Sequence, residues 1–212
     1  MRKIINILTL CAFLFAIPAN AQEMRGIFLE MPDSIVPLLT QNNRADCVDF
    51  LDAKMRARVT NKFDGHSELM QLTADYLKMQ LTGHTFLQMK LLPRSSGDTI
   101  ICMINTVCAE ARDSRIRFYT KEWQEIKPAT AMFKKPMIKD FFTAGESLDK
   151  ILQIADIYLV EYSFSPTETT MQANYTMPAY MSRADSAFVT KSMHPIVYRW
   201  TGKSFEPDKQ NK

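Results

Sequence analysis

The sequence lacks every short motif that would assign it to a catalytic, metal-binding or nucleotide-binding class. Its three histidines are His66, His84 and His194, and no two of them share the i,i+2 or i,i+4 spacing of metal ligands. No Gly-x-Ser-x-Gly sequence marks a nucleophile. We therefore predict no catalytic, cofactor-binding or metal-binding residue, and we interpret the histidines as surface or turn residues. Whether the protein is an enzyme stays open, and a non-enzymatic role is favoured.

Only one long apolar run is present, and it lies at the start of the chain. Two basic residues precede the apolar stretch Ile4–Ile17, and an Ala-x-Ala sequence at residues 19–21 matches the pattern that signal peptidase cleaves. The stretch is shorter than the roughly 20 residues that span a membrane. We therefore predict a signal peptide at residues 1–21, cleavage before Gln22, export, and no transmembrane segment in the mature chain.

The chain also lacks a strong charge bias. Loss of the two basic residues of the predicted signal peptide takes Lys+Arg from 26 to 24, while Asp+Glu stays at 23, so the mature net charge is +1. No cluster of basic residues exceeds Lys134-Lys135. Nucleic-acid-binding proteins usually carry a basic patch or stripe. We therefore predict no nucleic-acid partner.

Cysteine is scarce, with Cys47, Cys102 and Cys108 left in the predicted mature chain. An odd number leaves at least one thiol free or paired between chains. Cys102 and Cys108 lie on one predicted strand, about 20 Å apart, whereas a disulfide needs Cα atoms about 4.4–6.8 Å apart. A bridge from Cys47 to one of the other two is the internal pairing left open.

Methionine and aspartate are present in patterns that have both a structural and a functional interpretation. The 14 methionines are scattered along the chain, which favours core filling over a soft copper site. Asp46, Asp49 and Asp52 recur at every third residue. A helix face does not wrap Ca²⁺ as a loop does, so we interpret this stripe as a solvated face.

The hydrophobic pattern predicts an α+β protein. Helices are expected to begin at Met31–Ile35, with Asp33 or Ser34 as N-cap, and to cover Arg44–Met55. Short strands separated by turn residues follow and indicate a mostly antiparallel sheet. These strands are expected at Val59–Phe63, Glu68–Thr73, Asp75–Leu81, Thr85–Leu92, Thr99–Cys108 and Arg115–Tyr119.

The second half repeats this alternation after a proline-containing boundary at Lys127–Pro136. A helix is predicted at Ser147–Ile154, with a helical turn at Lys139–Phe142. Ser182-x-x-Asp185 resembles a capping box that opens another helix, although Ala187–Thr190 has an equally good strand pattern. The remaining strands are expected at Ile157–Phe164, Thr169–Met177, Pro195–Trp200 and around Phe205.

Landmarks recur in the same order in the two halves. Asp49-Phe50-Leu51 matches Asp140-Phe141-Phe142, and each half ends in an aromatic strand followed by a turn. We therefore predict two tandem helix-plus-antiparallel-sheet units with two layers each, at residues 22–127 and 128–212.

Six parts of the chain form a recognisable set: Asp75-Tyr76-Leu77, Lys90-Leu91-Leu92-Pro93, Thr106-Val107-Cys108, the segment from Asp113 to Tyr119, Trp123 and the segment from Pro195 to Trp200. Together they resemble a family of secreted proteins of unknown function found in Bacteroidales, the domain of unknown function 3256 family. The resemblance implies a periplasmic or cell-surface location in a Gram-negative bacterium and implies no active site. The tandem units also resemble β-lactamase inhibitory protein in architecture alone, which does not imply inhibition.

The same resemblance implies that three tripeptides are candidate modification sites. Asp, then Ser or Thr, then an apolar residue is the O-glycosylation acceptor pattern of such bacteria, which makes Ser34, Thr99 and Ser186 candidate acceptors. The pattern is equally typical of caps and turns.

For function, we favour a non-enzymatic envelope protein that binds a protein or peptide through a sheet face or groove. The second half is rich in aromatic residues, and an exposed subset would form a partner-binding face. The alternatives are a hydrolase with a spatially assembled site, which needs a pocket holding one of the histidines, and a small-ligand carrier, which needs a large apolar cavity.

Overall fold

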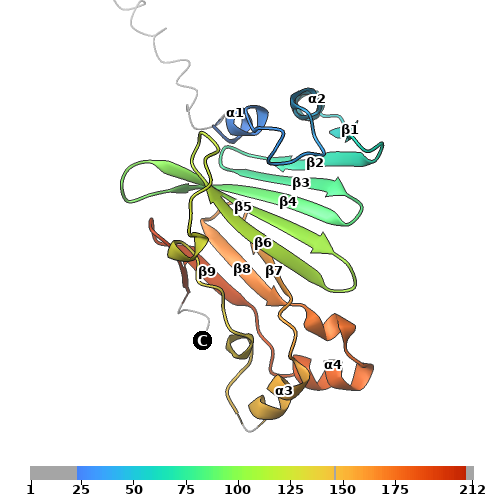
Figure 1. Ribbon diagram of the computed structural model, residues 1–212, viewed down its shortest axis with the longest axis vertical. Coiled ribbons are helices and arrows are strands. Elements are labelled where there is room, and N and C mark those ends of the chain that lie inside the picture. Colours follow the sequence, from blue (N-terminus) through green and yellow to red (C-terminus); the bar gives the residue numbers. More distant parts are fainter. Residues whose placement is uncertain (1–22, 146, 209–212) are drawn as a thin grey trace, which may run out of the picture.

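The computed structural model describes residues 23–145 and 147–208, so the predicted signal peptide lies outside the described residues. Within these ranges the chain forms four α-helices, a six-stranded sheet and a four-stranded sheet (Figure 1). Every strand pair in both sheets is antiparallel. The predicted α+β class with two antiparallel sheet units is confirmed. None of the described helices is long and apolar enough to cross a membrane.

The first sheet is a meander in which each strand pairs with the next along the chain. All six strands agree with the sequence prediction to within a few residues, because alternating side chains and tight turns define them locally. A register shift between Leu69 and Gln71 places a bulge at Met70. The strands are β1 (Arg58–Thr60), β2 (His66–Leu72), β3 (Tyr76–Thr82), β4 (Thr85–Pro93), β5 (Thr99–Cys108) and β6 (Arg112–Tyr119).

The predicted start of the first helix is wrong. The helix α1 covers Glu23–Leu29, and residues 31–37 form turns and irregular chain. The Asp33 carboxylate, expected to cap a helix, instead accepts a hydrogen bond from the Arg44 guanidinium. The spacing of Met24, Ile27 and Phe28 would have revealed α1, since i, i+3, i+4 is a helical pattern.

The second helix begins and ends three residues earlier than predicted. It is α2, Gln41–Asp52, and its N-cap is Thr40. The Thr40 hydroxyl accepts from the Asn43 backbone amide, and the Asn43 side chain accepts from the Thr40 amide in return. This reciprocal pair satisfies two donors that the helix itself leaves free.

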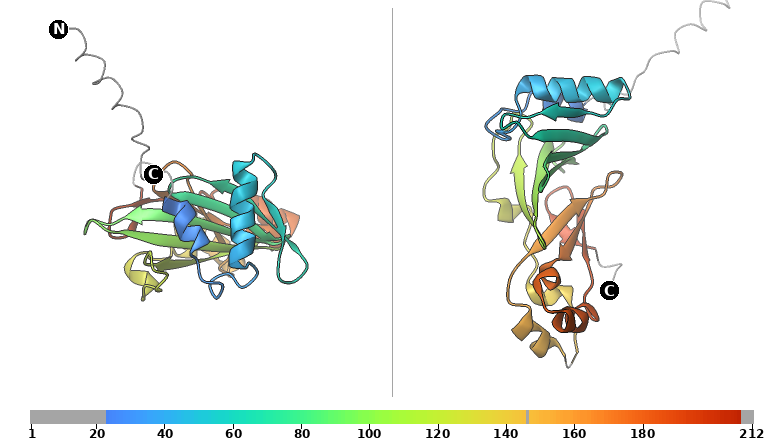
Figure 2. Two further views of the ribbon diagram at one scale, coloured as in Figure 1. Left: turned by 90° about the horizontal axis from the view of Figure 1, so that it is seen from above. Right: turned by 90° about the vertical axis from the view of Figure 1, so that its right-hand side faces the viewer.

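The helices α1 and α2 cover one face of the first sheet, and Figure 2 shows α2 running across the strands. Leu77 and Met79 of β3 and Met89 of β4 point toward the helices and are fully buried, together with Phe28 of α1 and Cys47 of α2. Burial of such side chains contributes about 1.5–3 kcal/mol each. This helix-side core therefore anchors the first sheet, and several methionines fill it as predicted.

The second sheet has the order β10-β9-β8-β7. The alternative strand at Ala187–Thr190 is wrong, because Ser182 accepts a hydrogen bond from the Asp185 amide and opens a helix there. The elements are β7 (Val160–Phe164), β8 (Thr170–Tyr175), β9 (Ile196–Trp200), β10 (Phe205–Pro207), α3 (Leu148–Ile154), α4 (Arg183–Thr190) and the 3₁₀ helices η2 (Ala129–Ala131), η3 (Ile138–Phe141) and η4 (Met177–Tyr180).

The second sheet packs against the face of the first sheet that the helices leave free. One hydrophobic cluster contains Cys102 and Phe118 from the first sheet together with Tyr162, Phe164 and Trp200 from the second. The right-hand view of Figure 2 shows the two sheets meeting at one side and diverging at the other. The division into units at residues 127 and 128 falls between β6 and η2 and stays a prediction.

Candidate functional site

The candidate site is the cleft between the diverging parts of the two sheets. It has a volume of about 380 Å³, which lies within the range of ligand pockets. One wall is the face of β2, β3 and β4 opposite the helices, including Met70, Lys78 and Phe86. The other wall is the outer side of β7, including Glu161 and Ser163. The lining therefore mixes apolar, amide, hydroxyl and charged groups.

The base of the cleft is the junction where the edge of β7 meets side chains of the first sheet. The backbone amide of Tyr162 donates to the Ser114 hydroxyl at 3.0 Å. The amide of Val160 donates to the Asp113 carboxylate at 3.2 Å, on the same edge. Edge strands expose alternate amides that need partners. Acceptors on the first sheet thus fix where the second sheet sits.

Gln88 belongs to the same junction and also lines the cleft. Its Oε1 accepts from the Phe164 amide and from the Tyr76 hydroxyl, both at 3.1 Å. Burial raises the pKa of Tyr76 to about 12, so this hydroxyl keeps its proton at neutral pH. A backbone amide can only donate, so the oxygen of Gln88 must face it and the Nε2 donor lies on the other side. Within the described residues, Nε2 has no hydrogen-bond partner in the protein.

Lys78 stands beside Gln88 in the sheet register. It is half-buried on β3, opposite Gln71 on β2 and opposite Gln88 on β4. Among the described residues no carboxylate pairs with it, whereas Arg112 at the cleft is paired with Glu161 at 2.8 Å. The lining therefore carries one positive charge without a counter-charge.

Lys90 holds the β7–β8 turn against the first sheet. Its side chain is fully buried, and its ammonium lies 2.8 Å from the Asp75 carboxylate and donates to the Pro166 carbonyl at 3.1 Å. A buried ammonium needs such partners because desolvation is costly. Strand alternation places Lys90 on this face, but nothing in the sequence indicates that the carbonyl of Pro166, 76 residues away, accepts a hydrogen bond from it.

The histidines and the aspartates of α2 that were considered from the sequence as candidate site residues lie away from the cleft. His66, His84 and His194 are exposed, as predicted, and none lines either of the two cavities described for the structure. No specific observation therefore favours the hydrolase alternative. The described residues contain no group of three or more His, Cys, Asp or Glu side chains suited to a metal ion. The acidic stripe of α2, Asp46, Asp49 and Asp52, is exposed as predicted.

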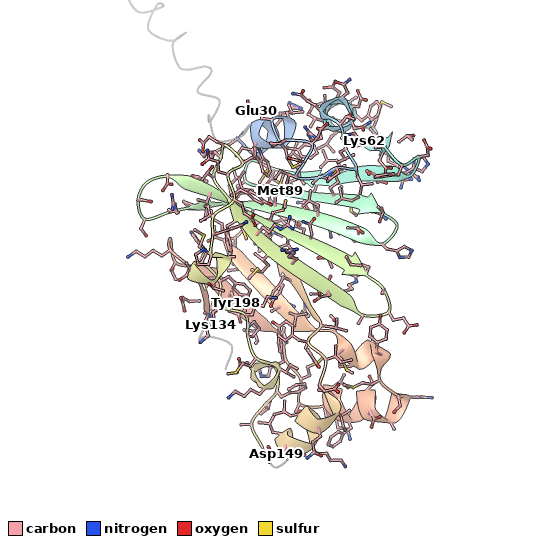
Figure 3. All side chains as sticks on the ribbon, viewed as in Figure 1. Glu30, Lys62, Met89, Lys134, Asp149 and Tyr198 are labelled. Atoms are coloured by element: carbon pink, nitrogen blue, oxygen red, sulfur yellow. The ribbon has the colours of Figure 1, made fainter. Side chains whose placement is uncertain are left out.

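The second cavity, about 390 Å³, lies between the segment 130–137 and β10. Figure 3 shows two of its lining residues, Lys134 and Tyr198, close together beside the second sheet. Most aromatic residues expected to form a partner-binding face, such as Tyr175 and Trp200, are instead buried in the inter-sheet cluster. Tyr180 is the large exception at 49% exposed.

The three cysteines are free in the structure. Cys47 belongs to the helix-side core and Cys102 to the inter-sheet cluster, so the first sheet separates them and the bridge left open between them does not form. Burial raises the pKa of the Cys47 thiol to about 11 and that of Cys102 well above its usual value. Cys108 is half-buried at the end of β5.

The candidate glycan acceptors differ in exposure. Ser34 is exposed in a turn, Thr99 is half-buried at the start of β5, and Ser186 is half-buried on α4. A modifying enzyme needs an accessible hydroxyl, so Ser34 is the best placed of the three.

The fold and the cleft define a class of α+β protein in which a helix-covered meander and a smaller antiparallel sheet share one core. A family model described as a protein of unknown function (DUF3256) matches residues 16–205, and the chain belongs to this family. The predicted membership is thereby confirmed.

A solved structure that is similar to this chain matches it over almost the whole length. It is described as a domain of an uncharacterized protein from Porphyromonas gingivalis W83, with 25% sequence identity and a TM-score of 0.76. The match covers 90% of this chain and 100% of that one. No curated protein matches the sequence.

Proposed function

We propose that the protein binds an extended segment of another protein, or a peptide, in the cleft between its two sheets, and that it does so outside the cytoplasm without catalysing a reaction. The observation that carries this proposal is the cleft itself. It joins apolar surface at Met70 and Phe86 to the Lys78 ammonium and the Gln88 amide donor, for which the described residues provide no partner. A concave lining with a few polar groups in fixed positions is typical of binding sites.

Three of the four sheet edges, at β7, β10 and β6, favour binding at a face over addition of a strand. The backbone amides along the edge of β7 donate to side chains of the first sheet. At β10, the Phe205 amide donates to the Met132 carbonyl. At β6, the Phe118 carbonyl accepts from Ile126. A partner that added a strand at these edges would have to displace existing contacts.

Site-specific photocross-linking in the producing bacterium tests this proposal. A photoreactive phenylalanine analogue is placed at Phe86, inside the cleft, and in a matched control at the exposed Ile157, outside it. We expect a cross-linked protein or peptide of defined mass at position 86 and none at position 157. Equal adducts at both positions, or none at position 86 in exported protein, would count against a binding cleft.

We also propose export through residues 1–21 and O-glycosylation at Ser34. The support is the signal-peptide pattern and the exposure of Ser34 within the acceptor tripeptide. Fractionation and intact mass of native protein test both. We expect a chain that begins at Gln22 with added mass that Ser34→Ala removes. A cytoplasmic protein contradicts export, and a mass equal to residues 22–212 contradicts glycosylation.

A further inference from the structure

Two neighbouring side chains indicate which chemical group the cleft recognises. Lys78 and Gln88 are directly opposite each other on β3 and β4, and both line the cleft. Side chains in directly opposite positions of an antiparallel pair start from Cβ atoms about 4.5–5.5 Å apart. Resting on the proposed function, we propose that the Lys78 ammonium and the Gln88 Nε2 together bind a carboxylate of the peptide partner.

The Gln88 donor is held in place before any ligand arrives. Its side-chain oxygen is occupied by the Phe164 amide and the Tyr76 hydroxyl, so the amide group cannot turn over without losing both bonds. The residue is only 7% exposed, and its Nε2 has no protein partner in the described part of the chain. Gln88 lines the cleft, and its Nε2 is not one of the fully buried polar atoms, so this donor can be reached from the cleft. A ligand oxygen at this place would satisfy it.

The charges of the cleft favour an anionic ligand group beside Lys78 and Gln88. Arg112 is neutralised by Glu161, and the deeper Lys90 is neutralised by Asp75, but Lys78 has no carboxylate partner among the described residues. A carboxylate has two acceptor oxygens, which suits two adjacent donors, and a charged acceptor strengthens both hydrogen bonds.

A peptide is the source of carboxylate that the remaining lining favours. Met70, Phe86 and Pro166 give apolar contacts for the side chains that flank an acidic residue. Gln71, opposite Lys78 on β2, adds an amide on the far side of the ammonium. A small free acid would leave these surfaces unused.

Fluorescence anisotropy with defined peptides tests the assignment. The probe is a fluorescein-labelled, C-terminally amidated heptapeptide with one glutamate between two phenylalanines, and its analogue has glutamine in place of glutamate. We expect wild-type protein to bind the glutamate peptide about fivefold more tightly than the analogue. The preference should shrink as the salt concentration rises, because the charge pair is partly exposed.

Two variants and one control connect that preference to the site. Lys78→Gln removes the charge, and Gln88→Glu keeps an acceptor oxygen for the two existing bonds while replacing the free donor. Each should reduce the preference for the glutamate peptide to less than about twofold. Lys203→Gln, an exposed lysine in the β9–β10 turn, should leave it unchanged. Circular dichroism checks that each variant is folded.

The outcomes separate this inference from the proposed function. An unchanged glutamate preference in folded Lys78→Gln, or equal binding of both peptides by wild type, overturns the carboxylate site even if the cross-link at Phe86 is found. Displacement of the peptide by an acidic trisaccharide or by acetate at lower concentrations than by unlabelled glutamate peptide overturns the peptide assignment. Absence of the cross-link at Phe86 contradicts the proposed function itself.

Discussion

Arg44 shows how a single side chain organises a segment that has no regular structure. It is 2% exposed, and its Nη1 donates to the Asp33 carboxylate at 3.0 Å and to the Leu39 carbonyl at 3.1 Å. Its Nη2 donates to the Met31 carbonyl. The guanidinium thus joins both ends of the irregular chain between α1 and α2, using the planar donor fork that distinguishes arginine from lysine.

We predict that Arg44→Ala lowers the free energy of unfolding by about 3 kcal/mol, because it leaves buried carbonyls without donors. Urea denaturation measures this change. The control is Lys62→Ala, which removes an exposed ion pair with the same Asp33 and should cost less than about 0.5 kcal/mol. A similar loss in both variants would contradict the role assigned to Arg44.

The thiols provide a second prediction at this scale. In native protein we expect Cys108 to react with a maleimide well before Cys47 and Cys102, because both of those are fully buried and burial raises their pKa values. Labelling followed by peptide mass spectrometry measures the order, and urea should abolish the difference. Early labelling of Cys47 would show that the helix layer opens readily.

At the scale of elements, the β7 edge decides how the two sheets are held together. Sheet edges usually pair with another strand or are covered, but this one is satisfied by side chains of Asp113, Ser114 and Gln88. These hydrogen bonds fix the position of β7 more narrowly than apolar packing alone would, since each acceptor lies at one place on the first sheet.

We predict that Ser114→Ala destabilises the protein by about 2 kcal/mol, because the buried Tyr162 amide and the Thr106 hydroxyl both lose a partner. Ser163→Ala, next to Tyr162 on β7, is the matched control, since its hydroxyl has no hydrogen-bond partner among the described residues, and it should change little. Thermal or urea unfolding of the two variants gives the comparison. Equal stability of both variants would mean that the edge contacts contribute nothing.

Elements were predictable where the pattern is local. The strand Thr99–Cys108 agrees with β5 at both ends, because its apolar run is bounded by turn residues. The helix expected to begin at Met31–Ile35 does not form, because its expected cap, Asp33, bonds to Arg44 rather than to a helix amide. That choice depends on a residue 11 positions away, which local capping rules do not include.

At the scale of the whole molecule, the two sheets share a core. The cluster between them includes Trp200 of the second sheet, while Trp123 lies in the helix-side core of the first. The Trp200 indole also donates to the Pro93 carbonyl of β4. A shared core favours unfolding in one cooperative step.

The two tryptophans allow unfolding to be measured separately in the helix-side core and in the cluster between the sheets. We predict that in Trp123→Phe, and likewise in Trp200→Phe, the fluorescence of the remaining tryptophan and far-UV circular dichroism have the same urea midpoint. A lower urea midpoint for the Trp200 fluorescence than for the circular dichroism signal would show that residues 128–212 behave as a separate unit.

The sequence by itself determined the α+β class, most strands and the family, because strand alternation, turn residues and motif order are local properties of the chain. It also placed the histidines and the acidic stripe on the surface. Only the tertiary structure decided where the candidate site lies. In the sequence, Gln88 and Lys78 are ordinary polar positions of two strands. Their donors become a candidate site only because the β7 amide of Phe164 occupies the oxygen of Gln88 and no carboxylate in the described part of the chain pairs with Lys78. Those are properties of contacts between distant segments, which no local pattern contains.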